Sequence, residues 1–166
     1  MKNIILLLIG LYFTSCGDGS DKNATELWND GKKYRTENKL KESITSYKII
    51  LDKYPSDNLA AKAQFEIADI YLNDVKDFDF AVEEFQNVVD QYPDHEVTKK
   101  SLFMIAYIYN NYLNAYSDAI ITYKLFREKY PNDALIPSVN FELNGLKDIQ
   151  TTIDSLNLII NKKSNI

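Results

Sequence analysis

The sequence predicts an all-α protein, an α-solenoid of three helical hairpins with a 38-residue period and a C-terminal capping helix. One observation is that a four-residue motif, which reads DKYP, DQYP and EKYP, occurs three times and ends at Pro55, Pro93 and Pro131. Another is that the apolar side chains before each ending follow helical spacing. The chain also has only five glycines in 166 residues, which argues against a loop-rich β protein.

The three segments before the endings align without a gap. Each begins its apolar stripe with a small residue, and apolar or aromatic residues follow at helical spacing, which places them on one face of an α-helix. The small residues are Ser43, Ala81 and Ala119, the first aromatic ones are Tyr47, Phe85 and Tyr123, and the closing ones are Tyr54, Tyr92 and Tyr130. These segments are therefore predicted to be the second helices of the hairpins.

A second helical pattern lies upstream of each segment. In it, Gly31, Ala68 and Ala106 each stand three residues before a Tyr. Small residues at matched places in two helices let the backbones approach closely, while aromatic side chains fill the space around them. Each repeat is thus predicted to be a helical hairpin.

The Tyr-Pro pairs are predicted to end the second helices. Proline lacks an amide hydrogen and restricts the residue before it, so each helix should stop near the Tyr. Residues with short polar side chains then follow and serve as N-caps of the next helix. The expected caps are Ser56 or Asp57, Asp94, and Asn132 or Asp133.

The pattern resembles the tetratricopeptide repeat, whose helix pairs carry Leu-Gly-x-x-Tyr, then Ala-x-x-x-Phe, then Pro. The second copy reads Ile67-Ala68-x-x-Tyr71, Ala81-x-x-x-Phe85 and Pro93, and the other two copies are in phase with it. The departures are a period of 38 residues, longer than usual, and Asp30 in an apolar position. The resemblance covers residues 24 to about 146. The longer period is similar to that of cell-envelope members such as outer-membrane assembly lipoproteins of the BamD type and the periplasmic Tol-Pal coordinator.

The N-terminal sixteen residues are expected to direct export. Lys2 precedes an apolar run from Ile4 to Phe13, which is too short to span a bilayer of about 30 Å as a helix. The following Phe13-Thr14-Ser15-Cys16 resembles the lipobox of bacterial lipoproteins, which implies lipidation of Cys16 and an extracytoplasmic location at a bacterial membrane. Gly17 in place of an acidic residue favours the outer membrane over the inner one. An ordinary secretory signal or a buried structural Cys are the alternatives.

These observations divide the chain into seven segments. We expect a signal peptide at 1–15 and a lipidated Cys with a flexible tether at 16–23. Three repeats follow at 24–57, 58–95 and 96–133, then a partial repeat at 134–146 and an amphipathic helix at 147–166. Leu146, Ile149, Ile153, Leu156 and Ile160 form an apolar seam in that last helix. The seam is interpreted as a cap on the solenoid, with a docking surface or a dimer seam as the alternative.

Composition and motifs argue against several classes of function. The formal net charge is −5, which does not suit nucleic-acid binding through bulk charge. His95 is the only histidine, which excludes a multi-His metal site. It lies just after the second Tyr-Pro pair, where a solvated turn is expected, which argues against a His-based triad. No cofactor-binding motif is present, and we expect no enzyme.

The resemblance implies that a concave groove, formed by the first helix of each hairpin, binds a protein or peptide partner. The groove positions are Trp28, Lys32, Arg35, Lys62, Phe65, Asp69, Asn73, Lys100, Phe103, Tyr107, Asn110 and Asn111. Four are basic and one is acidic, which favours a peptide with carboxylate groups. The aromatic residues Trp28, Phe65 and Phe103 either contact the ligand or only pack.

The expected function is that of a membrane-anchored, non-enzymatic scaffold for a protein partner in the bacterial cell envelope, possible roles being outer-membrane assembly or maintenance. The alternative is a structural or surface lipoprotein that forms homo-oligomers through its C-terminal helix and has no groove ligand.

Overall fold

The computed structural model describes residues 21–163. The predicted signal peptide and Cys16 lie outside the described residues. Within the described range the regular structure is entirely helical. The helices are α1 (Ala24–Thr36), α2 (Leu40–Lys53), α3 (Asn58–Ile70), the π-helix η1 (Tyr71–Val75), α4 (Phe78–Gln91), α5 (Glu96–Asn111), α6 (Tyr116–Lys129), α7 (Ile136–Gly145) and α8 (Lys147–Lys163).

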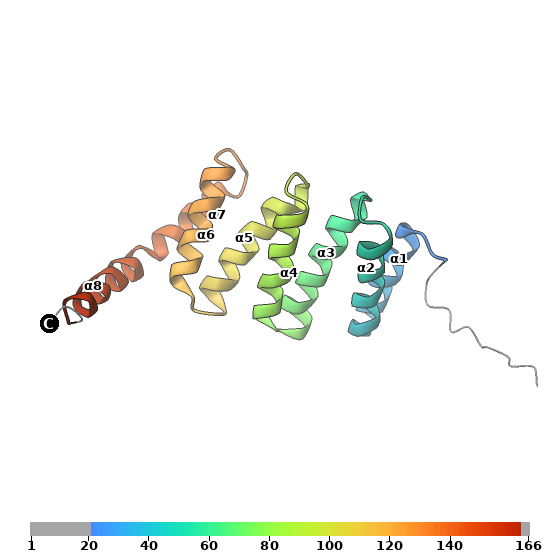
Figure 1. The fold of residues 1–166 in the computed structure, drawn as a ribbon, viewed down its shortest axis with the longest axis horizontal. Helices are drawn as coiled ribbons and strands as arrows, with labels where there is room; N and C mark the ends of the chain where they lie inside the picture. The colour runs from blue at the N-terminus through green and yellow to red at the C-terminus, as the bar shows by residue number, and fades with distance from the viewer. Residues whose placement is uncertain (1–20, 164–166) are drawn as a thin grey trace, which may run out of the picture.

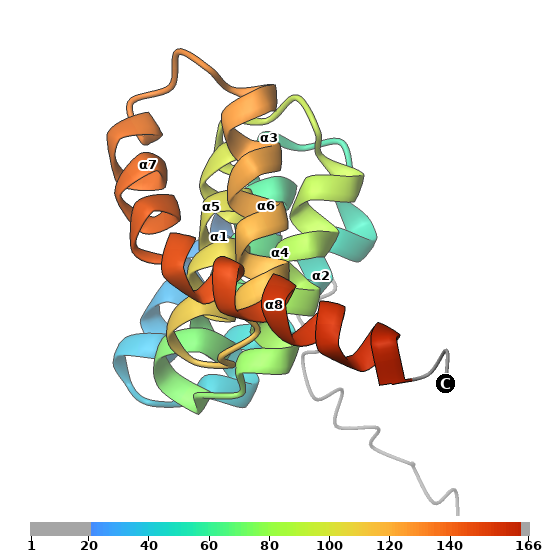
Figure 2. The same ribbon diagram turned by 90° about the vertical axis from the view of Figure 1, so that its left-hand side faces the viewer.

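The helices form a row of antiparallel hairpins, α1–α2, α3–α4 and α5–α6, as the sequence predicts (Figure 1). Each hairpin packs against the next, and consecutive first helices also contact each other, α1 with α3 and α3 with α5. The second helices touch one another at most marginally. Because the first helices contact one another and the second helices hardly do, the first helices form the inner, concave layer of the solenoid. Figure 2 shows the two layers of helices in a view along the row.

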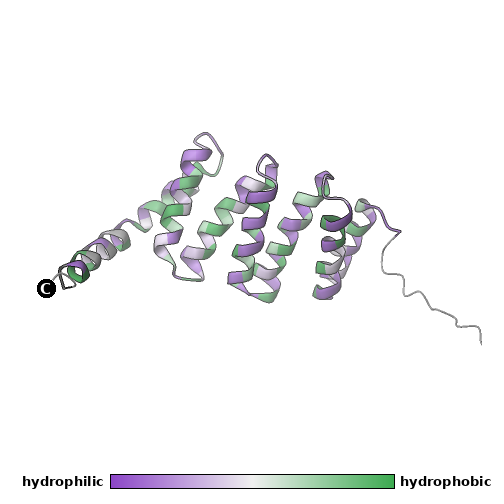
Figure 3. Cartoon of the chain, viewed as in Figure 1, coloured by the Kyte–Doolittle hydropathy of each residue, from purple (hydrophilic) through white to green (hydrophobic). Residues whose placement is uncertain are grey.

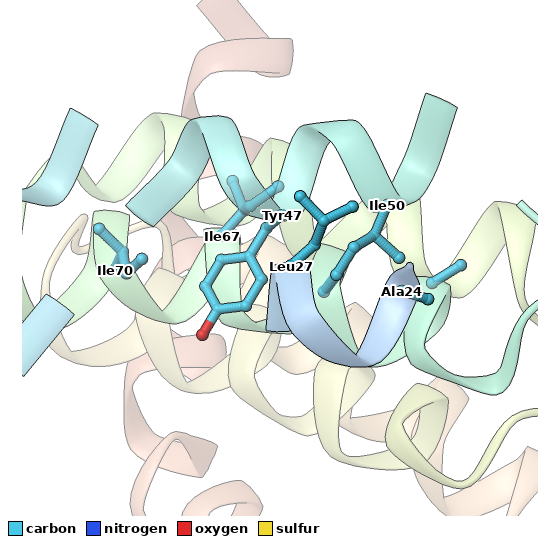
Figure 4. Packing of buried hydrophobic residues seen from close by; sticks show 8 residues of the cluster. Ala24, Leu27, Tyr47, Ile50, Ile67 and Ile70 are labelled. Atoms are coloured by element: carbon cyan, nitrogen blue, oxygen red, sulfur yellow. The ribbon is translucent and has the colours of Figure 1, made fainter. Parts of the chain in front are cut away.

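Three clusters of buried side chains form the core, roughly one at each hairpin. In the first, Tyr47 and Ile50 of α2 pack against Leu27 of α1 and against Ile67 and Ile70 of α3 (Figure 4). Apolar residues occupy one side of the hairpin helices, and polar residues the other (Figure 3). Because each cluster joins neighbouring hairpins, the core is continuous along the row.

The predicted helix ends are confirmed. The second helices end at Lys53, Gln91 and Lys129, immediately before the three Tyr-Pro pairs. At each end the amide of the Tyr still donates to a carbonyl one turn back, at Ile50, Val88 and Phe126. The Tyr thus closes the helix and the proline stops it.

The N-cap predictions are confirmed in part. Asp57 caps α3 and accepts a hydrogen bond from the amide of Leu59 at 2.8 Å. The cap of α5 is His95 and not Asp94, because His95 Nδ1 accepts from the amide of Val97 at 3.2 Å. The Nε2 atom of His95 lies 2.8 Å from Asn58 Oδ1, so this histidine joins the starts of α3 and α5.

The turn inside each hairpin contains one residue in the left-handed conformation. These residues are Asn38, Lys76 and Asn114, with φ of 58°, 62° and 53°. In each turn the carbonyl of a first-helix Tyr accepts an amide from beyond the turn, as in Tyr71 with Asp77 at 2.9 Å. The small residues of the two helices are one position further apart in the second and third repeats than in the first. In the second repeat the extra residue coincides with η1, where the helix widens into a π-helix.

The C-terminal end of the solenoid is covered by α7 and the first turn of α8. Val139 and Leu146 are buried, and Ile149 packs against the same cluster. Further along α8, Leu156 and Ile160 are 54% and 61% exposed, and the helix projects away from the body (Figure 1). The helix at 147–163 thus caps the solenoid only through its first turn. Among the described residues, no helix has the length and apolar content needed to cross a membrane.

Candidate partner-binding groove

The three groove aromatics all pack inside their own hairpins. The ring of Trp28 lies 5.4 Å from that of Tyr47, Phe65 lies 5.2 Å from Phe85, and Phe103 lies 5.7 Å from Tyr123. Phe65 is only 7% exposed, and the Nζ atom of Lys100 lies 4.7 Å from its ring centroid. Trp28 and Phe103 are half-buried, so these two have ring surface left for a partner.

Arg35 is surrounded by carboxylates from the next repeat. Its guanidinium donates to Glu66 at 3.0 Å, to Asp69 at 2.6 Å and to Asp74 at 2.7 Å and 2.8 Å. The guanidinium fork satisfies several acceptors at once, as arginine does best. This cluster joins the C-terminal end of α1 to α3 and η1, and it occupies the side chain that was predicted to receive a ligand.

The Arg35 cluster also shifts the ionisation of its members. Burial raises the pKa of the Glu66 carboxyl, although Arg35 acts in the opposite direction. Burial disfavours the Arg35 charge, but its hydrogen bonds and attraction to Asp69 and Asp74 keep its pKa above the ordinary value. One cation is shared among three carboxylates, which is why it does not fully compensate the desolvation of Glu66.

Further polar contacts join consecutive first helices across the groove floor. Lys62 of α3 pairs with Glu96 of α5 at 3.2 Å, and Asn110 of α5 donates to Glu142 of α7 at 2.9 Å. Two other predicted groove residues have local partners, since Asn73 donates to Asp69 and Asn111 to the carbonyl of Tyr107. Two of the four basic groove residues, Arg35 and Lys62, are therefore neutralised within the fold, whereas Lys32 and Lys100 form no ion pair with another described residue.

The part of the groove that stays open lies beside α5. A cavity of about 350 Å³ is lined there by Lys99, Lys100, Phe103, Met104, Glu96, Asp133 and Leu135. Tyr107 stacks on Phe103 one turn further along, with ring centroids 6.4 Å apart. Lys32 is exposed and has no ion pair within the described residues.

Sequence reasoning missed Glu66 and Glu142, which neutralise the groove. A signal was present, because each directly follows the groove aromatic of its repeat, Phe65 or Phe141. Both glutamates therefore occupy the same position of the repeat, next to the groove. Asp133 was expected only as an N-cap, and its ion pair with Lys99 at 2.6 Å was not predicted. No group of three or more His, Cys, Asp or Glu side chains in the described part of the chain is placed to hold a metal ion.

Comparison with protein families agrees with this geometry. Residues 100–133 match the family model of the tetratricopeptide repeat, a segment that runs from within α5 through α6 to Asp133. A search of curated proteins found no match to the chain. The third hairpin thus matches the tetratricopeptide repeat, and the arrangement of the described helices is that of a solenoid of similar hairpins. This repeat supports a role as a scaffold for protein–protein interaction.

Proposed function

We propose that this protein is a lipid-anchored, non-enzymatic scaffold in a bacterial cell envelope, which holds a protein partner in the groove on its concave face. The observation that carries the proposal is the open cavity beside α5, where Phe103 and Met104 form an apolar floor and Lys100 supplies a charge. A half-buried aromatic in a concave, mostly apolar site is the usual anchor point of a protein interface.

The groove suits an extended segment better than a small molecule. The three hairpins place Lys32, the cavity beside Phe103 and Tyr107 along one face of consecutive first helices. The Arg35 cluster and the Lys62–Glu96 pair tie these helices together. The first helices thus form a rigid surface with a few separated contact points, and an extended peptide can contact several of them at once.

The anchor in this proposal is Cys16. Its support is the sequence Phe13-Thr14-Ser15-Cys16 followed by a short polar stretch, which in this proposal serves as the tether. The end of the predicted tether at 16–23 is fixed to the fold, because Lys22 pairs with Asp30 and Asn23 caps α1. Lipid chains give stable membrane attachment when more than one is present. Tethering then raises the effective concentration of the scaffold for partners at the same membrane, and Gly17 favours the outer membrane.

Two measurements test the proposal. For the anchor, Cys16→Ser should move the protein from the membrane fraction to the soluble one, and unchanged fractionation would rule the anchor out. For the groove, tagged wild type and a Lys32→Ala/Lys100→Ala variant are used to recover envelope proteins, quantified by mass spectrometry. Lys41→Ala/Lys48→Ala, on the exposed side of α2, is the matched control. Recovery of the same partner by wild type and control, but less by the groove variant, supports the proposal.

A second candidate function is self-association through α8. Leu156, Leu158, Ile159 and Ile160 are each more than half exposed, and such a run of apolar side chains is commonly covered by a partner. In this alternative the protein is a structural or surface lipoprotein without a groove ligand. Sedimentation of wild type against a Leu156→Gln/Ile160→Gln variant tests it, since only self-association through this seam predicts a drop in mass.

A further inference from the structure

A notch lies at the C-terminal end of the solenoid, between α6, α7 and the first residues of α8. It has a volume of about 310 Å³ and opens where α8 diverges from α6 and α7. Ile120, Leu143 and Leu146 form its apolar floor, and Lys124, Arg127 and Lys147 stand at its edge. Ile120 and Leu146 are 4% and 2% exposed, so the floor belongs to the core and is fixed in position.

The three cations at the edge of the notch are not neutralised by the fold. Lys124, Arg127 and Lys147 are exposed, and none of them forms an ion pair or a side-chain hydrogen bond with another described residue. The lining contains no carboxylate. The notch therefore concentrates positive charge in a chain whose formal net charge is −5.

The two arginines of the chain show the contrast directly. Arg35 donates to three carboxylates and joins two repeats, whereas Arg127 lines the notch with its guanidinium unpaired. Arginine is the side chain best suited to bidentate recognition of a carboxylate. The sequence predicts a ligand with carboxylate groups for the groove. The notch offers three unpaired cations to which such carboxylate groups could bind.

We propose that this notch binds an acidic amphipathic segment of a partner protein. An apolar side chain of that segment rests on Ile120, Leu143 and Leu146, and carboxylates beside it pair with Arg127, Lys124 and Lys147. The apolar floor favours a peptide over a bare phosphate, which needs only charge. The volume is at the small end of ligand pockets, which fits one anchoring side chain. The notch is separate from the concave groove, so the proposal for one site can be wrong while the proposal for the other holds.

A direct binding measurement tests this inference. The probe is a fluorescein-labelled peptide of about 14 residues, roughly four helical turns, with leucines on one face and glutamates beside them. Its anisotropy is measured with wild type and with Lys124→Glu/Arg127→Glu, and a peptide with glutamine in place of glutamate is the matched ligand. Lys41→Glu/Lys48→Glu is the control protein, since it changes the net charge by the same amount as the notch variant but on α2. Circular dichroism verifies that each variant is folded.

We expect the notch variant to bind the acidic peptide at least about tenfold more weakly than wild type and control. The glutamine peptide should also bind wild type more weakly by a similar factor. Failure of the acidic peptide to bind wild type at about 1 mM, or equal binding by the notch variant, overturns the inference. So does a loss of binding in Lys32→Ala/Lys100→Ala instead, which would assign the peptide to the groove.

Two further outcomes would assign the notch to another occupant. If phosphatidylglycerol vesicles sediment the wild type but not the notch variant, while the peptide does not compete, the notch binds anionic lipid and the peptide proposal is wrong. If the notch variant changes the mass of the protein in solution, its occupant is a second copy. Peptide binding that is unaffected by vesicles, with constant mass, supports the proposal.

Discussion

A Cβ atom placed on Gly31 would lie 2.6 Å from Cε1 of Tyr47. Gly31 lies in α1 and Tyr47 in α2, and both are buried. The hydroxyl of Ser43 donates to the carbonyl of Gly31 at 2.8 Å, so the two helices are in contact at this level. The glycine is therefore required by the close approach of the hairpin's helices.

We expect Gly31→Ala to lower the free energy of unfolding by about 2 to 3 kcal/mol, because the buried Tyr47 ring cannot move away without displacing its neighbours. Chemical denaturation measures this. Gly145→Ala is the control, since a Cβ there meets no atom within 4 Å and alanine favours a helix more than glycine does. Equal stability of Gly31→Ala and wild type would mean that the first hairpin is more loosely packed than described.

The hydroxyls of Tyr47 and Tyr123 are buried and have no hydrogen-bond partner among the described residues. The equivalent position of the second repeat is Phe85, and burial raises the pKa of both phenols. We expect Tyr47→Phe and Tyr123→Phe to keep the stability or to raise it by up to about 1 kcal/mol, because an unsatisfied polar group is removed. A loss of stability in thermal denaturation would mean that a bound water or ligand satisfies these hydroxyls.

The left-handed turn position is occupied by asparagine in the first and third repeats and by Lys76 in the second. Asparagine tolerates this conformation better than lysine does. We expect Lys76→Asn to raise the free energy of unfolding by about 0.5 to 1 kcal/mol, and the reciprocal Asn38→Lys to lower it by a similar amount. Both are measured by urea denaturation. Shifts of the same sign in the two variants would contradict the backbone assignment.

The ion pair of Lys99 with Asp133 predicts a pH dependence. The hydrogen bond from Lys99, with one from the amide of Leu135, holds the pKa of Asp133 below its ordinary value of 3.8. The unfolded chain therefore binds the proton more readily, so the stabilisation is present above that ordinary value and is lost as the pH falls through the folded pKa.

We expect Asp133→Asn to lower the urea midpoint at pH 7, and the difference from wild type to shrink as the pH falls below the ordinary pKa of 3.8 and through the lower pKa of the folded state. Asp52→Asn is the control, because its carboxylate is exposed and has no hydrogen bond or ion pair within the described part of the chain. A difference that does not vary with pH would show that the ionised pair does not contribute.

The repeat architecture could be predicted from the sequence because its determinants are periodic. Proline stops each second helix by its own covalent structure, and the small residues Ala81 and Ala119 recur at the phase where helices meet and are fully buried. Helical periodicity of this kind depends only on local spacing, so one sequence is enough to find it.

The groove chemistry could be predicted only in part, because it depends on pairs that are distant in the sequence. Arg35 and Asp74 are 39 residues apart, and nothing in either local pattern indicates that they meet. The position of α8 could not be predicted either, because it depends on where α7 ends. Only one residue separates α7 from α8, so there is no turn that could fold α8 back onto the solenoid. The unpaired state of Arg127 could not be predicted either, because it depends on where the carboxylates of neighbouring elements lie in the fold.

The most direct test of the central claim is site-specific photocrosslinking in intact cells. A photoreactive phenylalanine analogue replaces Tyr107, which is half-buried beside Phe103 in the groove, or Phe80, which is 49% exposed on α4. A scaffold that holds its partner on the concave face predicts a discrete protein adduct from position 107 and none from position 80. Adducts of equal yield from both positions, or an adduct from position 80 alone, would contradict the account.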